Sequence, residues 1–170
     1  MENNLLAYWL RWPAFEWLVE TYQWAWPLCE IAHFFGLILL FGGVGTFDLR
    51  LLGIGKKLPP AVLSRALPWG VFGFVLCVAS GAIFVGGIIG NVGIHPYTVL
   101  MTNVFLQLKL LFIGLAGLNL LGFYVTGMAK LTESLGPDAD APPLAKMFAA
   151  TSLALWVAVI YVGRLIPWEL

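Results

Sequence analysis

Four long apolar runs constrain this chain more than any other feature of its sequence. Each is long enough to cross the hydrocarbon core of a bilayer, and they extend over about Pro27 to Phe47, Pro68 to Ile89, Asn103 to Thr126 and Lys146 to Ile166. A mean hydropathy of +0.90 and a 61% share of apolar residues agree with this interpretation. The sequence therefore predicts an integral membrane protein.

The predicted fold is all-α. A helix pairs all its backbone N–H and C=O groups internally, whereas another open-chain structure would leave some of them without a partner in lipid. The connections between the runs are short, so consecutive helices are expected to be antiparallel. We expect an up-down four-helix bundle over residues 27–170. Gly73, Cys77 and Gly81 share one face of the second helix, which predicts close packing against a neighbour.

Residues 1–26 form a separate segment that is too polar for a cleavable signal peptide. Apolar residues recur there at helical spacing (Phe15, Leu18, Val19 and Tyr22), whereas Glu16 and Glu20 share the other side. Five tryptophans suit the headgroup level of a bilayer: Trp9, Trp12, Trp17, Trp24 and Trp26. The pattern predicts an amphipathic helix that lies flat on the outer leaflet.

The distribution of basic residues predicts the orientation, because lysine and arginine near helix ends favour the cytoplasmic side. The first and third connections carry six of them: Arg50, Lys56, Lys57, Arg65, Lys130 and Lys146. The opposite side carries Arg11, Lys109 and Arg164. We therefore expect a multi-pass protein of the bacterial inner membrane with both termini in the periplasm.

Charge and cysteine content exclude several function classes. Nine basic and nine acidic residues give a net charge of zero, which argues against nucleic acid as a partner. Cys29 and Cys77 lie inside apolar runs without the spacing of a zinc site or of covalent haem attachment, so we interpret them as packing residues.

Glu30 and His33 lie one helical turn apart inside the first run. Ionisable groups at that depth are costly in lipid and are usually retained for a function. With the predicted topology, further polar residues belong to the same membrane level: Asn103, Gln107, Lys109, Tyr161 and Arg164. The sequence thus predicts a polar layer near the outer surface.

This layer suits haem b, with His33 as an axial ligand oriented by a carboxylate such as Glu30. Gly36, one turn further along, is expected to leave room for a flat ligand. Lys109 and Arg164 are expected to neutralise the propionates, and His95 is the candidate second ligand. Flat apolar walls are expected from Phe34, Phe105, Trp156 and Tyr161.

Simpler interpretations stand beside this one. A transmembrane histidine often only forms hydrogen bonds across helices, and Lys109 or Arg164 can extend to the lipid headgroups. Asp48 and Arg50 are interpreted as a structural ion pair or a topology signal. A copper site is a further alternative, with its soft ligands at one level: Met101, His95, Cys29 and His33.

A resemblance covers nearly the whole chain. It rests on Glu30, His33, Gly36, Gly42 and the run from Asp48 to Gly53, then on Phe105 with Lys109 and on Trp156 with Gly163 and Arg164. In these residues the chain resembles a family of small bacterial four-helix integral membrane proteins, which implies the fold and the polar layer but no activity.

In pattern, the chain is also similar to copper-resistance D-type membrane proteins and HemJ-type protoporphyrinogen oxidases. These proteins place a histidine in an early helix and a lysine at the start of a later one. In the oxidase group both residues matter for haem binding and activity. The resemblance thereby implies such a role for His33 and Lys109.

Three hypotheses for the function follow. The first is a haem b protein that transfers electrons between the quinol pool and a periplasmic redox protein. The second is a cofactor-free accessory or structural subunit of a larger membrane complex. The third is a HemJ-like membrane oxidase acting on a porphyrinogen or another hydrophobic substrate, with Glu30 or Lys109 as a base.

Overall fold

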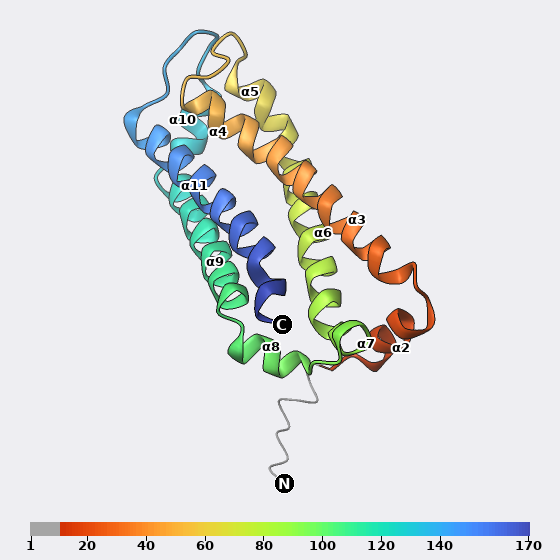
Figure 1. Ribbon diagram of the computed structural model, residues 1–170. Helices are drawn as coiled ribbons and strands as arrows, with labels where there is room; N and C mark the ends of the chain where they lie inside the picture. The colour runs from red at the N-terminus through yellow and green to blue at the C-terminus, as the bar shows by residue number, and fades with distance from the viewer. Residues whose placement is uncertain (1–10) are drawn as a thin grey trace.

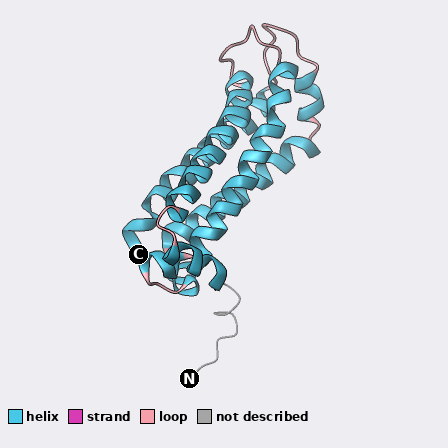
Figure 2. Ribbon diagram, turned by 90° about the vertical axis from the view of Figure 1, so that its right-hand side faces the viewer, coloured by secondary structure: helices cyan, strands magenta, loops and turns pink. Residues whose placement is uncertain are grey.

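The computed structural model describes residues 11–170, and within this range the chain consists of helices joined by turns and loops (Figures 1 and 2). Four helical stretches are long and apolar enough to cross a membrane: Ala25–Leu51, Pro60–Gly86, Val104–Val125 and Pro143–Glu169. At about 1.5 Å per residue, even the shortest spans roughly 30 Å, the thickness of a hydrocarbon core. The predicted all-α four-helix fold is confirmed.

Three of these stretches combine several helical segments. The first contains α3 (Ala25–Leu40), the π-helical segment η1 (Phe41–Gly45) and α4 (Thr46–Leu51). The second contains α5 (Pro60–Leu63), the 3₁₀ turn η2 (Ser64–Ala66) and α6 (Leu67–Gly86). The third is α9 (Val104–Val125), and the fourth contains α11 (Pro143–Leu165) and the 3₁₀ turn η3 (Ile166–Glu169).

The second stretch begins at Pro60, eight residues before the expected start at Pro68. Pro68 lies in the first turn of α6, where a missing backbone N–H costs no helical hydrogen bond. The helical path therefore continues through this proline. Its far end is at Gly86, slightly earlier than predicted, and the short helix α7 (Ile88–Val92) follows.

The four stretches form two antiparallel hairpins, in which α3 packs along α6 and α9 packs along α11 (Figure 1). The hairpins meet mainly at what we call the loop end, where α4 contacts α11 and α5 contacts α10 (Met128–Glu133). An apolar core fills this junction and consists of Phe47, Leu51, Phe123, Ala129, Ala141, Ala145 and Ala149. The up-down order is as predicted.

Small residues bring α3 and α6 close together. A methyl group built on Gly36 would lie 2.7 Å from both Cys77 Sγ and Gly73 O, and one built on Gly73 would lie 2.7 Å from Leu40 N. The predicted packing role of Gly73 and Cys77 is confirmed. The prediction that Gly36 leaves room for a flat ligand is wrong, because α6 occupies that space.

At the opposite end, which we call the terminal end, α2 (Pro13–Thr21) packs against α7. Trp12 and Phe15 lie over Gly86 and Gly87. The helix predicted from the amphipathic pattern is present, and its position on a membrane surface stays a prediction. Trp9 lies outside the described residues.

Glu16 differs from its predicted place on the polar side of this segment. It is only 5% exposed, and its carboxylate forms an ion pair with Arg11 Nε at 3.0 Å. The backbone of Glu16 faces Gly90 of α7, where a Cβ would lie 2.8 Å from the Glu16 carbonyl oxygen. Packing of α2 on α7 thus buries a residue that a helix lying flat on lipid would expose.

Candidate functional site

His33 is half-buried on α3 and faces α6, where its Nδ1 lies 2.8 Å from Ser80 Oγ. The Ser80 hydroxyl donates its single hydrogen to the Leu76 carbonyl oxygen at 2.6 Å. We assign the imidazole hydrogen to Nδ1, with Ser80 Oγ as its acceptor, because the Leu76 and Cys77 carbonyl oxygens lie 2.6 and 3.2 Å from the same hydroxyl. This assignment leaves Nε2 with a free lone pair, as a metal ligand requires.

Lys109 approaches this histidine from the other hairpin. A Cβ built on Gly163 of α11 would lie 3.3 Å from Lys109 Nζ, so the absence of a side chain there lets the ammonium lie against α11. Its positive charge acts on both His33 and Cys77. Within residues 11–170, Lys109 forms neither a side-chain hydrogen bond nor an ion pair. A shared role of His33 and Lys109 stays a prediction.

Aromatic rings flank the histidine on the terminal side. The Phe84 ring lies 5.5 Å from the imidazole and 5.1 Å from the Trp26 ring, measured between centroids. Trp26 Nε1 donates to Glu30 Oε1 at 3.1 Å. Glu30 is therefore exposed and bound along its own helix, and the group that orients His33 is Ser80 instead.

Other predicted site residues lie apart from His33. Tyr161 is 65% exposed, and it points about 160° away from Gly163 at 3.6 residues per turn. Arg164 is also exposed. Trp156 lies deeper in the bundle, with its ring 6.0 Å from that of Phe74. Within residues 11–170, no hydrogen bond or ring contact joins any of these three residues to the imidazole.

His95 is half-buried at the N-terminal cap of α8 (Pro96–Thr102), where its Nδ1 accepts from the Tyr97 backbone N–H at 3.2 Å. No three His, Cys, Asp or Glu side chains within residues 11–170 lie close enough together to hold a metal ion. This finding leaves the copper alternative without a ligand cluster in that part of the chain.

That the residues around His33 hold a haem stays a prediction. A neutral imidazole with its Nδ1–H held by Ser80 has Nε2 free for iron, and Lys109 supplies a cation from the facing hairpin for a propionate. The residues present thus supply one ligand and one counter-charge. They do not include the glycine space or the tyrosine wall expected from the sequence.

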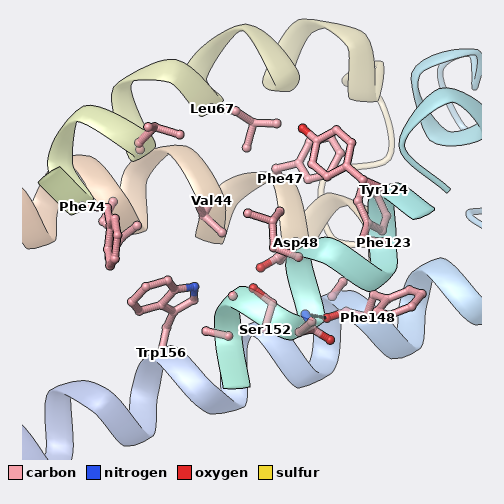
Figure 3. Close-up of a pocket in the computed structure, with 18 of the residues that line it drawn as sticks. Val44, Phe47, Asp48, Leu67, Phe74, Phe123, Tyr124, Phe148, Ser152 and Trp156 are labelled. Carbon is pink, nitrogen blue, oxygen red and sulfur yellow. Dashed lines mark hydrogen bonds between the residues drawn. The ribbon is translucent and has the colours of Figure 1, made fainter. Parts of the chain in front are cut away.

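A second feature lies nearer the loop end, where a cavity of about 270 Å³ separates the two hairpins (Figure 3). All four membrane-spanning stretches line it, and its walls are largely apolar and aromatic. Asp48, Asn119 and Ser152 are polar exceptions. The Asp48 carboxyl is buried with Ser152 beside it, and within residues 11–170 its Oδ2 has no hydrogen-bond partner. A buried acceptor without a partner is uncommon in folded proteins.

Sequence reasoning missed both Ser80 and this cavity. Ser80 had a detectable signal, because a serine inside an apolar span is a candidate partner for a buried histidine. Asp48 also had a sequence signal, because a carboxylate within a membrane span suggests a function. Its closeness to Arg50 in the chain led instead to the interpretation as an ion pair. The cavity itself has no local sequence signal, because four separate stretches form it.

No family model, curated protein or solved structure matches this chain. The resemblances inferred from the sequence therefore stay predictions.

Proposed function

We propose that this multi-pass membrane protein binds haem b at His33 and transfers electrons between a quinol and a periplasmic redox protein. One observation carries the proposal. In the assigned tautomer Ser80 accepts from the Nδ1–H of a transmembrane histidine, which leaves Nε2 free, and Lys109, which has no hydrogen-bond or ion-pair partner within residues 11–170, lies on the facing hairpin. Imidazole oriented through its second nitrogen is the usual axial ligand of haem iron.

The residues around the imidazole have separate roles in this proposal. Ser80 fixes the tautomer and the rotation of the ring, because its own hydrogen is committed to the Leu76 carbonyl. Lys109 contributes positive charge next to the anionic side of the ligand, and Gly163 leaves space for its ammonium. Phe84 shields one side of the imidazole from lipid and headgroups. Bound haem supplies reversible one-electron oxidation and reduction.

The proposal includes an orientation in the bacterial inner membrane. The loop end carries most of the basic residues and is assigned to the cytoplasm, so His33 and both termini lie toward the periplasm. This side is the one from which a periplasmic redox protein approaches. Fusing a cytoplasm-active or periplasm-active reporter to the C-terminus tests the assignment.

The main test is the absorption spectrum of the protein, produced with haem available and purified in mild detergent. We expect a Soret band that is lost in His33→Ala and retained in His95→Ala, the matched control with the other histidine of the chain. Lys109→Met should keep the band and lower haem occupancy. A folded, monodisperse and colourless wild-type protein would refute the proposal and favour the cofactor-free accessory subunit.

The oxidase hypothesis makes a different demand. It requires purified, haem-loaded protein to oxidise a porphyrinogen faster than the same protein carrying His33→Ala. Of the two candidate bases, Glu30 is exposed and bound to Trp26 rather than directed at the imidazole, which leaves Lys109 as the base of this hypothesis.

A further inference from the structure

We propose that the cavity between the hairpins binds the aromatic head group of a membrane quinol, with Asp48 accepting a hydrogen bond from a quinol hydroxyl. This inference deepens the proposed function, in which the electron donor is a quinol, and it concerns a site separate from His33. It rests on the size of the cavity, its aromatic walls and one buried acceptor that lacks a partner.

The size of the cavity suits one or two fused rings. Its volume is about 270 Å³, whereas an apolar cavity of about 150 Å³ is sufficient for benzene. Stretches from both hairpins line this partly open cavity, so a ligand there is contacted from both sides. It lies in the part of the bundle where α4 meets α11, away from the terminal end.

The walls are rich in flat aromatic side chains from four different helices: Phe47, Phe74, Phe123, Tyr124, Phe148 and Trp156 (Figure 3). Several already contact each other at right or steep angles, including Phe74 with Trp156 and Phe123 with Phe148. Such walls favour a planar ring over the disordered end of a lipid chain. The reason is that the faces and edges of aromatic rings pack in defined orientations.

The polar groups in the cavity favour a hydroxyl donor. Asp48 is 6% exposed, and its Oδ2 has no hydrogen-bond partner among residues 11–170, although Ser152 lies beside the carboxyl. Asn119 already donates to the Phe148 carbonyl oxygen at 3.0 Å. A quinol hydroxyl directed at Oδ2 would satisfy this acceptor, whereas a hydrocarbon chain has no group that could do so.

The cavity is also suitably placed relative to His33. Its rim includes Leu40, which lies seven residues after His33 on α3, or about 10 Å along the helix at 1.5 Å per residue. Phe74 and Trp156 line the same cavity. A quinol bound there would therefore lie inside the same bundle as the proposed haem, toward the loop end.

Binding of a short-chain quinol under anaerobic conditions tests the proposal. Calorimetric titration of detergent-solubilised protein with a decyl-substituted quinol should give one site, and Asp48→Leu should weaken binding at least tenfold. The dimethyl ether of the same quinol keeps the ring but lacks hydroxyl donors, so it should bind as weakly to wild type as the quinol does to Asp48→Leu. Asp140→Asn, which changes an exposed acid, should bind like wild type.

Three results would overturn the proposal. One is equal quinol affinity for wild type, Asp48→Leu and Asp48→Asn, with folding checked by circular dichroism. Another is equal affinity for the quinol and its dimethyl ether, and the third is displacement of the quinol by decane at similar concentration. Repeating the titration on His33→Ala separates the two proposals. Colourless protein that binds quinol refutes only the haem, whereas coloured protein that does not bind quinol refutes only this site.

Discussion

Asp48 and Arg50 lie two residues apart on α4 and do not form an ion pair. At 3.6 residues per turn their side chains point about 160° apart, so Asp48 faces the cavity and Arg50 faces the loops. Arg50 Nε donates to the Leu58 carbonyl oxygen at 2.6 Å, and Nη2 donates to the Ala139 carbonyl oxygen at 3.2 Å. The predicted ion pair is wrong, and each residue has a role of its own.

Arg50 is predicted to stabilise the loop end. It is 1% exposed and holds carbonyl groups of two loops that are far apart in sequence. Arg50→Met removes these charge-assisted hydrogen bonds from a buried side chain, which should lower the free energy of unfolding by about 3 kcal/mol. Thermal unfolding in detergent measures this loss. Exposed Arg65→Met is the control and should change stability little, so equal effects of the two substitutions would contradict the role.

Asp48 is predicted to reduce the stability of the ligand-free protein. A buried carboxyl oxygen without a partner costs roughly 1–3 kcal/mol. Asp48→Leu should therefore raise the thermal midpoint by several degrees while it weakens quinol binding, as expected where function opposes stability. A lower midpoint for Asp48→Leu would mean that Asp48 is a structural residue.

The contact between α3 and α6 is predicted to depend on glycine. Gly36→Ala places a methyl group 2.7 Å from the Gly73 carbonyl oxygen, and the resulting displacement should cost about 1–3 kcal/mol. Gly114→Ala on α9 is the control, because among residues 11–170 its added methyl group meets nothing within 4 Å beyond its own helical turn. Reversible unfolding in mixed micelles compares the two. Similar stabilities would show that the helices adjust at no cost.

Asp140 forms exposed ion pairs with Lys56 and Lys146 at the loop end. These ion pairs predict a small dependence of fold stability on pH. Hydrogen bonds from Lys56 and Lys146, at 2.7 and 3.2 Å, lower the pKa of the Asp140 carboxyl. A lowered folded pKa stabilises the fold above the ordinary pKa of 3.8, and this contribution is lost as the pH falls through the folded value.

Asp140→Asn should therefore reduce stability slightly at neutral pH and match wild type in strong acid. Unfolding midpoints measured between pH 2 and 7 would show convergence of the two proteins toward the acid end. The difference should also shrink in high salt, because exposed ion pairs are screened. A constant difference at all pH values would assign the effect to something other than charge.

Ser80 is predicted to tune haem affinity without ligating the iron. Ser80→Ala removes the acceptor for His33 Nδ1–H, which should lower haem affinity about 10–100-fold while the Soret band persists at saturating haem. Ser64→Ala is the matched control, since its hydroxyl bonds only the Ala61 carbonyl oxygen. Unchanged affinity in Ser80→Ala would show that Ser80 does not orient the ligand.

The sequence by itself determined the four helices and their alternating direction, and it singled out His33 as a candidate site residue. These follow from local rules: long apolar runs in lipid must be helical, short connections reverse direction, and an ionisable group within a span needs a partner. The small residues Gly73 and Cys77 also indicated a packing face correctly.

Only the tertiary structure decided how each helix is rotated and which hairpin faces which. In the folded protein, His33 lies beside Ser80 and Tyr161 is exposed. Helix α6 occupies the space beside Gly36, and Trp156 lines the same cavity as Asp48. The physical reason is that a membrane helix is apolar both toward lipid and toward its neighbours. Hydrophobic periodicity therefore carries little information about its rotation, which packing of four separate stretches determines instead.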